Sequence, residues 1–176
     1  MKKATALLLT AAIALGICGC GRIDSKKVDD LIDEGYVIEQ VDDNNICIFE
    51  DGVEYYYKSG LINPVFEQAV FTVSPNPEHS DWPDRTVTIR PEGTQIYVTA
   101  EKHYITTNRD GEEVEHTDGF LFKFLWGTGF EEEDLYNTRG FADVAGDYRS
   151  FIENYLTPDE LQEVYDRAKE LQKELY

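Results

Sequence analysis

Hydrophobic and polar residues alternate along most of the first two thirds of the chain. A period of two residues is typical of strands that bury one face. Turn-forming residues such as Asp51-Gly52 and Asp110-Gly111 separate the alternating runs and favour hairpins. We therefore predict an antiparallel sheet made of consecutive hairpins. The expected strands are residues 37–41, 46–49, 53–58, 65–73, 86–90, 94–99, 103–107, 112–116 and 120–126.

The pattern changes to helical spacing after residue 129. Apolar residues recur every three or four positions from Phe141 to Tyr155 and again after Thr157-Pro158, a dipeptide suited to a helix start. A short helix is also expected near the N-terminus, capped by Ser25 and ended by Gly35. We predict an α+β fold in which the two C-terminal amphipathic helices pack on the sheet. Residues 26–176 form the single domain.

The first residues read as an export signal and not as part of the fold. Met1-Lys2-Lys3 is basic, and the run from Ala4 to Ile17 is apolar and uncharged. This run is shorter than the roughly 20 residues that a membrane-spanning helix needs. A basic start followed by a short apolar core is characteristic of secretory signals.

The end of this signal, Ile17-Cys18-Gly19-Cys20, resembles the lipobox of bacterial lipoprotein precursors. The resemblance covers residues 1–20 and implies a signal peptide of residues 1–19, with cleavage before Cys20. It further implies that Cys20 carries several acyl chains such as palmitate and that residues 20–25 are a short tether. The protein would then be lipid-anchored on the extracytoplasmic face of the cell membrane. An ordinary secretory signal that happens to contain two cysteines is the alternative.

Charge excludes one class of partner. The chain has 16 basic and 35 acidic residues, and loss of Lys2 and Lys3 would change its net charge from -19 to -21. Nucleic acid needs basic side chains to meet its phosphates, so we exclude it as a ligand. The acidity fits either plain solubility on a crowded surface or a more specific role, in which the ligand is a cationic partner or bound calcium.

The third cysteine has no partner for a disulfide in the processed chain. Cys47 lies in the apolar run Ile46-Cys47-Ile48-Phe49. A free cysteine in such a run behaves as a small buried hydrophobic residue, and we assign it no chemical role.

Common catalytic strings are absent from the sequence, and no cofactor is predicted. One weak metal candidate depends on strand register. If Asp110-Gly111 forms a two-residue turn, His103 faces Asp118 and lies on the same side of the hairpin as His116. Two imidazoles and a carboxylate could bind zinc, although exposed histidines near acids are common, and we expect no metal there.

Aromatic residues supply the candidate ligand-binding site. Tyr55, Tyr56 and Tyr57 are consecutive, so at least one of them must point away from the core; we select Tyr56. Trp82 lies in a long loop between predicted strands, where an exposed ring could stack on a sugar. The competing interpretation is that Trp82 folds back against the end of the sheet.

Three functional hypotheses remain open at this stage. The leading one is a non-enzymatic, membrane-tethered module that binds a protein or glycan. The second is a small cell-envelope hydrolase. The third is an inhibitor or immunity-type protein that uses an acidic face.

Overall fold

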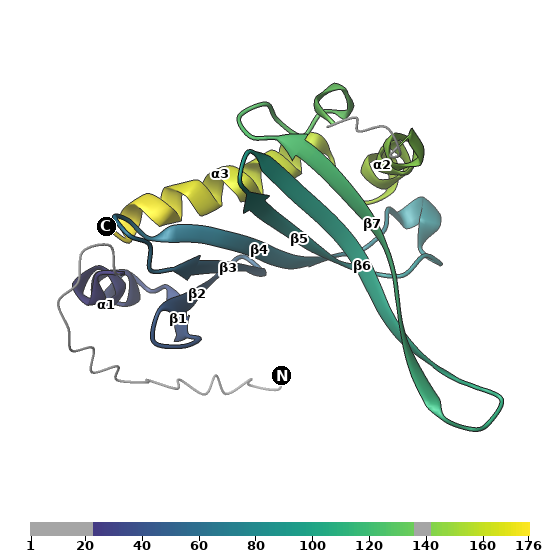
Figure 1. The fold of residues 1–176 in the computed structure, drawn as a ribbon, viewed down its shortest axis with the longest axis horizontal. Coiled ribbons are helices and arrows are strands. Elements are labelled where there is room, and N and C mark those ends of the chain that lie inside the picture. Colours follow the sequence, from purple (N-terminus) through teal and green to yellow (C-terminus); the bar gives the residue numbers. More distant parts are fainter. Residues whose placement is uncertain (1–22, 136–141) are drawn as a thin grey trace, which may run out of the picture.

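The computed structural model describes residues 23–135 and 142–176, with side chains from Tyr148 onward in the second range. Seven antiparallel strands form one open sheet in the order of the sequence, and three helices accompany it (Figure 1). The predicted α+β class is therefore confirmed. The strands are β1 (Val37–Gln40), β2 (Asn45–Glu50), β3 (Val53–Lys58), β4 (Val65–Val73), β5 (Arg85–Glu92), β6 (Gln95–Thr107) and β7 (Glu113–Leu125).

Hairpin turns connect consecutive strands, as the alternating pattern and its turn residues predict. Asp51 and Gly52 both have positive φ angles, +49° and +83°, between β2 and β3. Two successive positive φ values are the requirement of a type I′ turn, which matches the twist of the flanking strands. The hairpin predicted at this Asp-Gly pair is thus confirmed.

The last four predicted strands are in fact two long ones. β6 and β7 have 13 residues each and pair without a break from Gln95↔Leu125 to Thr107↔Glu113. The prediction of a break around residues 100–102 was wrong because no turn-forming residue lies there. Gly119 lies within β7, where an added Cβ would come within 2.9 Å of the Glu101 Cγ atom and 3.0 Å of the Ala100 carbonyl oxygen. This glycine permits close packing between strands and does not form a turn.

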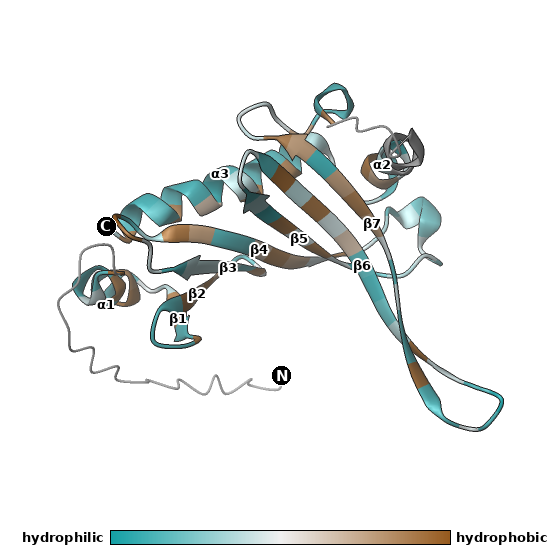
Figure 2. Cartoon of the chain, viewed as in Figure 1, coloured by the Kyte–Doolittle hydropathy of each residue, from teal (hydrophilic) through white to brown (hydrophobic). Residues whose placement is uncertain are grey.

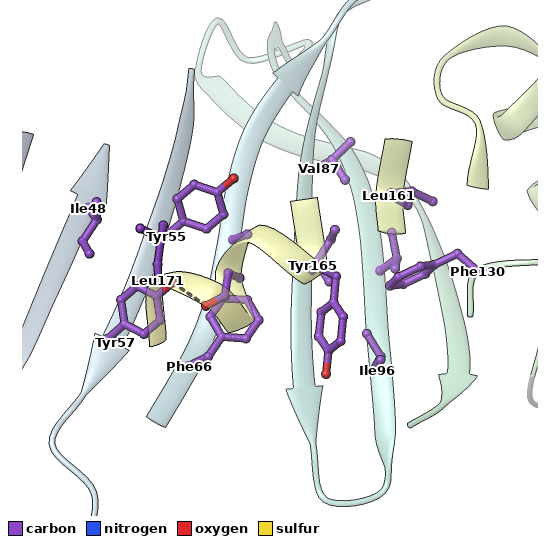
Figure 3. Packing of buried hydrophobic residues seen from close by; sticks show 14 of the residues in the cluster. Ile48, Tyr55, Tyr57, Phe66, Val87, Ile96, Phe130, Leu161, Tyr165 and Leu171 are labelled. Carbon is purple, nitrogen blue, oxygen red and sulfur yellow. Dashed lines mark hydrogen bonds between the residues drawn. The ribbon is translucent and has the colours of Figure 1, made fainter. Parts of the chain in front are cut away.

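The C-terminal helix α3 (Pro158–Glu174) covers the middle of the sheet (Figure 3). Its buried residues Leu161, Tyr165 and Leu171 belong to the same core cluster as Tyr57 and Phe66 of the sheet. The Tyr57 hydroxyl donates a hydrogen bond of 2.8 Å to the Ala168 carbonyl oxygen, which connects β3 with the helix. The predicted packing of this helix on the sheet is confirmed.

Helix α2 (Ala142–Asn154) packs against β7 through aromatic rings. The ring of Phe122 lies 4.8 Å from that of Tyr148 and 5.4 Å from that of Phe151, measured between centroids. Tyr148 and Phe151 are both buried, as the helical spacing predicts. Phe141, the first residue of that predicted stripe, lies outside the described residues.

The N-terminal helix α1 (Ser25–Asp33) lies beside β1 and buries Val28 and Leu31. Asp24, and not Ser25, caps it, since the Asp24 carboxylate accepts a hydrogen bond of 2.9 Å from the backbone N–H of Lys26. The described chain already contacts the domain at Ile23, whose N–H donates to the Ser59 hydroxyl. Residues 1–22, which include the predicted signal peptide and Cys20, lie outside the described residues. None of the described helices is long and apolar enough to cross a membrane.

Candidate functional site

The far ends of β6 and β7 leave the sheet as a two-stranded ribbon, which we call the arm and define as residues 102–118 (Figure 1). Strand β5 pairs with β6 only as far as Glu101, so the arm has no third strand. Six residue pairs, from Lys102↔Asp118 to Thr107↔Glu113, give it a length of roughly 20 Å at about 3.4 Å per residue.

The arm adds nothing to the hydrophobic core. No residue between 102 and 118 belongs to the cluster of buried side chains, and Figure 2 shows the arm as largely hydrophilic with isolated apolar bands. The side chains of Tyr104 and Ile105 are exposed, the latter by 60%. An isolated two-stranded ribbon is marginally stable in water at best. The arm is therefore a surface feature and not a structural support.

The tip of the arm is a compact turn. The Asn108 side-chain oxygen accepts hydrogen bonds of 2.9 Å from the backbone N–H groups of Asp110 and Glu112. The backbone N–H of Asn108 donates to the Glu112 carbonyl oxygen, also at 2.9 Å. Gly111 supplies the positive φ angle of +83°. These contacts fix the register of the whole ribbon.

That register separates the two histidines. His103 pairs with Thr117, and His116 pairs with Tyr104, one residue away from the alignment considered above. Paired residues share a face and successive residues alternate, so His103 and His116 lie on opposite faces. Asp118 pairs with Lys102 and lies on the face of His116. The two-histidine alignment is wrong because the turn spans more than Asp110-Gly111.

Each histidine instead contacts a hydroxyl group of its own face. The Nδ1 atom of His103 is 2.9 Å from the Thr117 hydroxyl, and the Nε2 atom of His116 is 2.7 Å from the Thr106 hydroxyl. His116 also stacks on Tyr104 at 5.1 Å. Within residues 23–135 and 142–176, no group of three or more His, Cys, Asp or Glu side chains is placed to hold a metal ion.

A buried arginine holds the base of the arm. Arg85, the first residue of β5, is only 7% exposed. Its Nη1 atom donates to the Asp118 carbonyl oxygen at 3.2 Å, and its Nε atom donates to the Tyr155 hydroxyl at 3.3 Å. The guanidinium also lies 4.5 Å from the ring centroid of Phe120, within cation–π range. Arg85 therefore connects the arm with the chain segment that follows α2.

The same tyrosine links this base to the loop between β4 and β5. The Tyr155 hydroxyl donates to the Pro83 carbonyl oxygen at 3.0 Å. Trp82 stacks on His79 at 4.6 Å, and its ring centroid lies 6.2 Å from that of Tyr155. Trp82 is 37% exposed, so it folds back on the domain while one part of its ring still faces solvent.

Tyr56 lies on the other face of the sheet. Its neighbours Tyr55 and Tyr57 are buried beneath the helices, whereas Tyr56 is partly exposed. The prediction that at least one of the three tyrosines points away from the core is confirmed. The Tyr56 hydroxyl donates to Glu54 at 2.6 Å, and this bond to the neutral hydroxyl raises the tyrosine pKa. Tyr56 and Trp82 thus belong to different surfaces and do not form one site.

Cys47 pairs with Tyr56 across β2 and β3. Its exposure is 2%, so its predicted burial is confirmed. Burial, with a smaller contribution from the negative charge of Glu54, raises the pKa of the Cys47 thiol to about 11. The thiol is therefore protonated at neutral pH and a poor nucleophile.

The acidic run at residues 131–133 lines an open depression. Among the described residues its lining consists of Glu131, Glu132 and Glu133. Glu132 already accepts two hydrogen bonds from Arg149, at 2.9 and 3.1 Å. Hydrolysis would require a nucleophile or a general acid–base pair placed against a substrate. The described lining of this depression does not bring such groups together.

Sequence reasoning missed Arg85 although the sequence contains its signal. Period-two alternation through Arg85, Val87 and Ile89 puts the arginine on the same face as two core residues. A charged residue on a core face needs hydrogen-bonding partners, and here Tyr155 and Asp118 provide them.

Compared with protein-family models, with curated proteins and with solved structures, the chain matches none of them.

Proposed function

We propose that this protein is a lipid-anchored, extracytoplasmic binding module that presents the arm to a protein partner. The observation that carries the proposal is the arm itself. It extends two strands beyond the sheet and contributes no residue to the core cluster. Since such a ribbon adds no side chain to the hydrophobic core, contact with another molecule accounts for it better than stability does.

The N-terminal side of the domain supports this arrangement. With Cys20 as the lipidated residue, only residues 21 and 22 separate the lipid from Ile23, which already contacts the domain. Three residues span about 10 Å at most, so the domain would lie close to the membrane. Helix α1 and the tip of the arm lie at opposite ends of the molecule (Figure 1). The arm would thus be held away from the attachment point.

The anchor is tested by exchanging cysteines in the full precursor. We expect Cys20→Ser to prevent labelling by an alkyne fatty acid and to move the protein from the detergent phase to the aqueous phase. Cys18→Ser is the matched control and should leave both labelling and partitioning unchanged. A Cys20→Ser protein that stays labelled in the membrane fraction would refute the anchor.

The arm is tested by a shortened protein in which an Asn-Gly turn joins Lys102 directly to Asp118. Because residues 103–117 contribute nothing to the core cluster, the free energy of unfolding of the shortened protein should lie within about 0.5 kcal/mol of that of the parent. The shortened protein should remain in the membrane. After extraction in mild detergent it should elute from gel filtration without the partner, so that the complex formed by the parent is absent. A complex of unchanged composition would refute the role of the arm.

A further inference from the structure

We propose that the outer edge of β7 in the arm binds an extended basic polypeptide segment as an additional antiparallel strand. This inference rests on the proposed function and specifies its partner chemistry. The ligand is a strand with Lys or Arg at alternate positions. Its basic side chains would face Glu113 and Glu115, and its backbone would pair with β7.

The edge of β7 is free of strand pairing along the arm. Within the described ranges, β7 is the last strand of the sheet, and its outer side shows only the isolated bridge Phe124↔Leu135, far from the arm. No register shift interrupts its pairing with β6. A long, regular free edge is a ready template for another strand unless bulges, prolines or charges protect it. Here charges are the only such feature.

Two backbone hydrogen bonds establish which groups point outward. The backbone N–H of Trp126 donates to the Thr94 carbonyl oxygen, and the backbone N–H of Asn108 donates to the Glu112 carbonyl oxygen, each at 2.9 Å. Hydrogen-bonded and non-hydrogen-bonded pairs alternate in an antiparallel ladder. Odd-numbered residues of the arm are therefore the non-hydrogen-bonded ones, and their N–H and C=O groups point away from the neighbouring strand. On β7 these residues are Glu113, Glu115 and Thr117.

The same residues define the charge that a ligand must match. Glu113 and Glu115 are exposed and lie on one face, two residues apart. Across the arm, five acidic residues stand against two basic ones. A strand added to β7 would place alternate side chains directly opposite the two glutamates, where opposite charges stabilise a cross-strand pair. The β6 edge differs, because its outward residues are His103, Ile105 and Thr107.

Charge also favours a basic ligand over a second copy of the chain. Two processed copies joined at this edge would each bring a net charge of -21 and the same two glutamates. Like charges at an interface suppress association, whereas complementary charges accelerate it. A basic segment satisfies both the free backbone groups and the free charges.

The test uses the processed, lipidated protein in detergent micelles and a defined probe. The probe is a ten-residue peptide of alternating Lys and Thr with blocked ends. In the proposed register each Lys stands opposite a glutamate, and the backbone N–H of that Lys faces β7. Methylating the backbone nitrogen of every Lys should abolish binding, whereas methylating that of every Thr should preserve it.

Protein variants identify the edge. Thr117→Pro removes one outward N–H from β7, and Thr117→Val is its matched control because both variants lose the contact with His103. Ile105→Pro makes the equivalent change on β6. We expect Thr117→Pro to weaken peptide binding about tenfold. Thr117→Val and Ile105→Pro should each change the affinity less than twofold. The exposed pair Glu113→Gln with Glu115→Gln disturbs no packing and should weaken binding about threefold.

The inference is supported if peptide binding is lost when the Lys backbone nitrogens are methylated and is weakened by Thr117→Pro. The absence of binding at 1 mM peptide would overturn it. Binding that tolerates both Lys methylation and Thr117→Pro would also overturn it, because attraction between charges alone would then explain the affinity. If the peptide fails while the shortened arm still abolishes the membrane complex, strand addition is refuted and the proposed function stands.

Discussion

Replacing Tyr155 with phenylalanine removes a single hydroxyl that connects three parts of the molecule. The hydroxyl accepts from the Arg85 Nε atom at 3.3 Å and donates to the Pro83 carbonyl oxygen at 3.0 Å. Tyr155→Phe leaves both groups without this partner while the guanidinium stays buried. By contrast, Arg85→Met removes the buried charge itself, and the hydroxyl can still donate to Pro83.

The two substitutions should therefore differ in cost. An unsatisfied buried polar group costs about 1–3 kcal/mol, so we expect Tyr155→Phe to destabilise the protein by about 2 kcal/mol. Arg85→Met loses the cation–π contact with Phe120, which is worth about 0.5–2 kcal/mol, and should cost about 1 kcal/mol. The ion pair with Asp118 adds little, because its oxygen is 3.7 Å away and the Asp118 side chain is 68% exposed.

A double-mutant cycle measured by urea unfolding tests this reasoning. Once Arg85 is absent, removing the Tyr155 hydroxyl no longer leaves the buried Nε–H group without its acceptor. We expect the double variant to cost about 1 kcal/mol less than the sum of the single ones. Additivity within about 0.3 kcal/mol would refute the coupling, as would a Tyr155→Phe protein as stable as the parent. Hydrogen exchange of the arm should accelerate in both single variants, because both loosen its base.

Two further predictions concern the core and the last helix. The folded pKa of Cys47, about 11, lies above its ordinary value of 9.0, so the stability linked to this thiol is complete below pH 9 and is lost as the pH rises towards 11. Over that range the parent should lose about 2 kcal/mol more than Cys47→Ala in unfolding titrations, and equal losses would contradict the raised pKa. Thr157→Ala removes the hydroxyl that accepts a hydrogen bond from the Glu160 backbone N–H and donates one to the Glu160 carboxylate at the start of α3, and it should cost about 1 kcal/mol. Thr157→Ser keeps the cap and should be nearly neutral; an equal loss in both variants would argue against capping.

The local signals in the sequence were sufficient for the core strands and the last helix. β3 and β4 begin and end where alternation predicted, and Thr157 caps α3 as its Thr-Pro start indicated. These features depend on periodicity and on turn or cap residues close in the chain. The fusion of the last predicted strands could not be foreseen in this way, because alternation does not reveal how far a pair extends past its neighbours.

The candidate site was harder to predict because it depends on register and on distant contacts. A one-residue difference at the arm's turn put His103 and His116 on opposite faces. Trp82 was placed correctly in a loop, but its contact with Tyr155 joins residues that are far apart in the sequence. The outward direction of the Glu113 and Glu115 backbone groups follows only once that register is known.

Photo-crosslinking from the arm in living cells tests the central claim most directly. A benzophenone amino acid at Ile105, which is exposed on the arm, is compared with one at Glu163, which is exposed on α3. Both are introduced into the full precursor and into its Cys20→Ser form. A membrane-tethered binding module predicts one discrete crosslinked species from Ile105, none from Glu163, and loss of the species when Cys20 is replaced. Equal crosslinking from both positions, or none from the arm, would contradict the account.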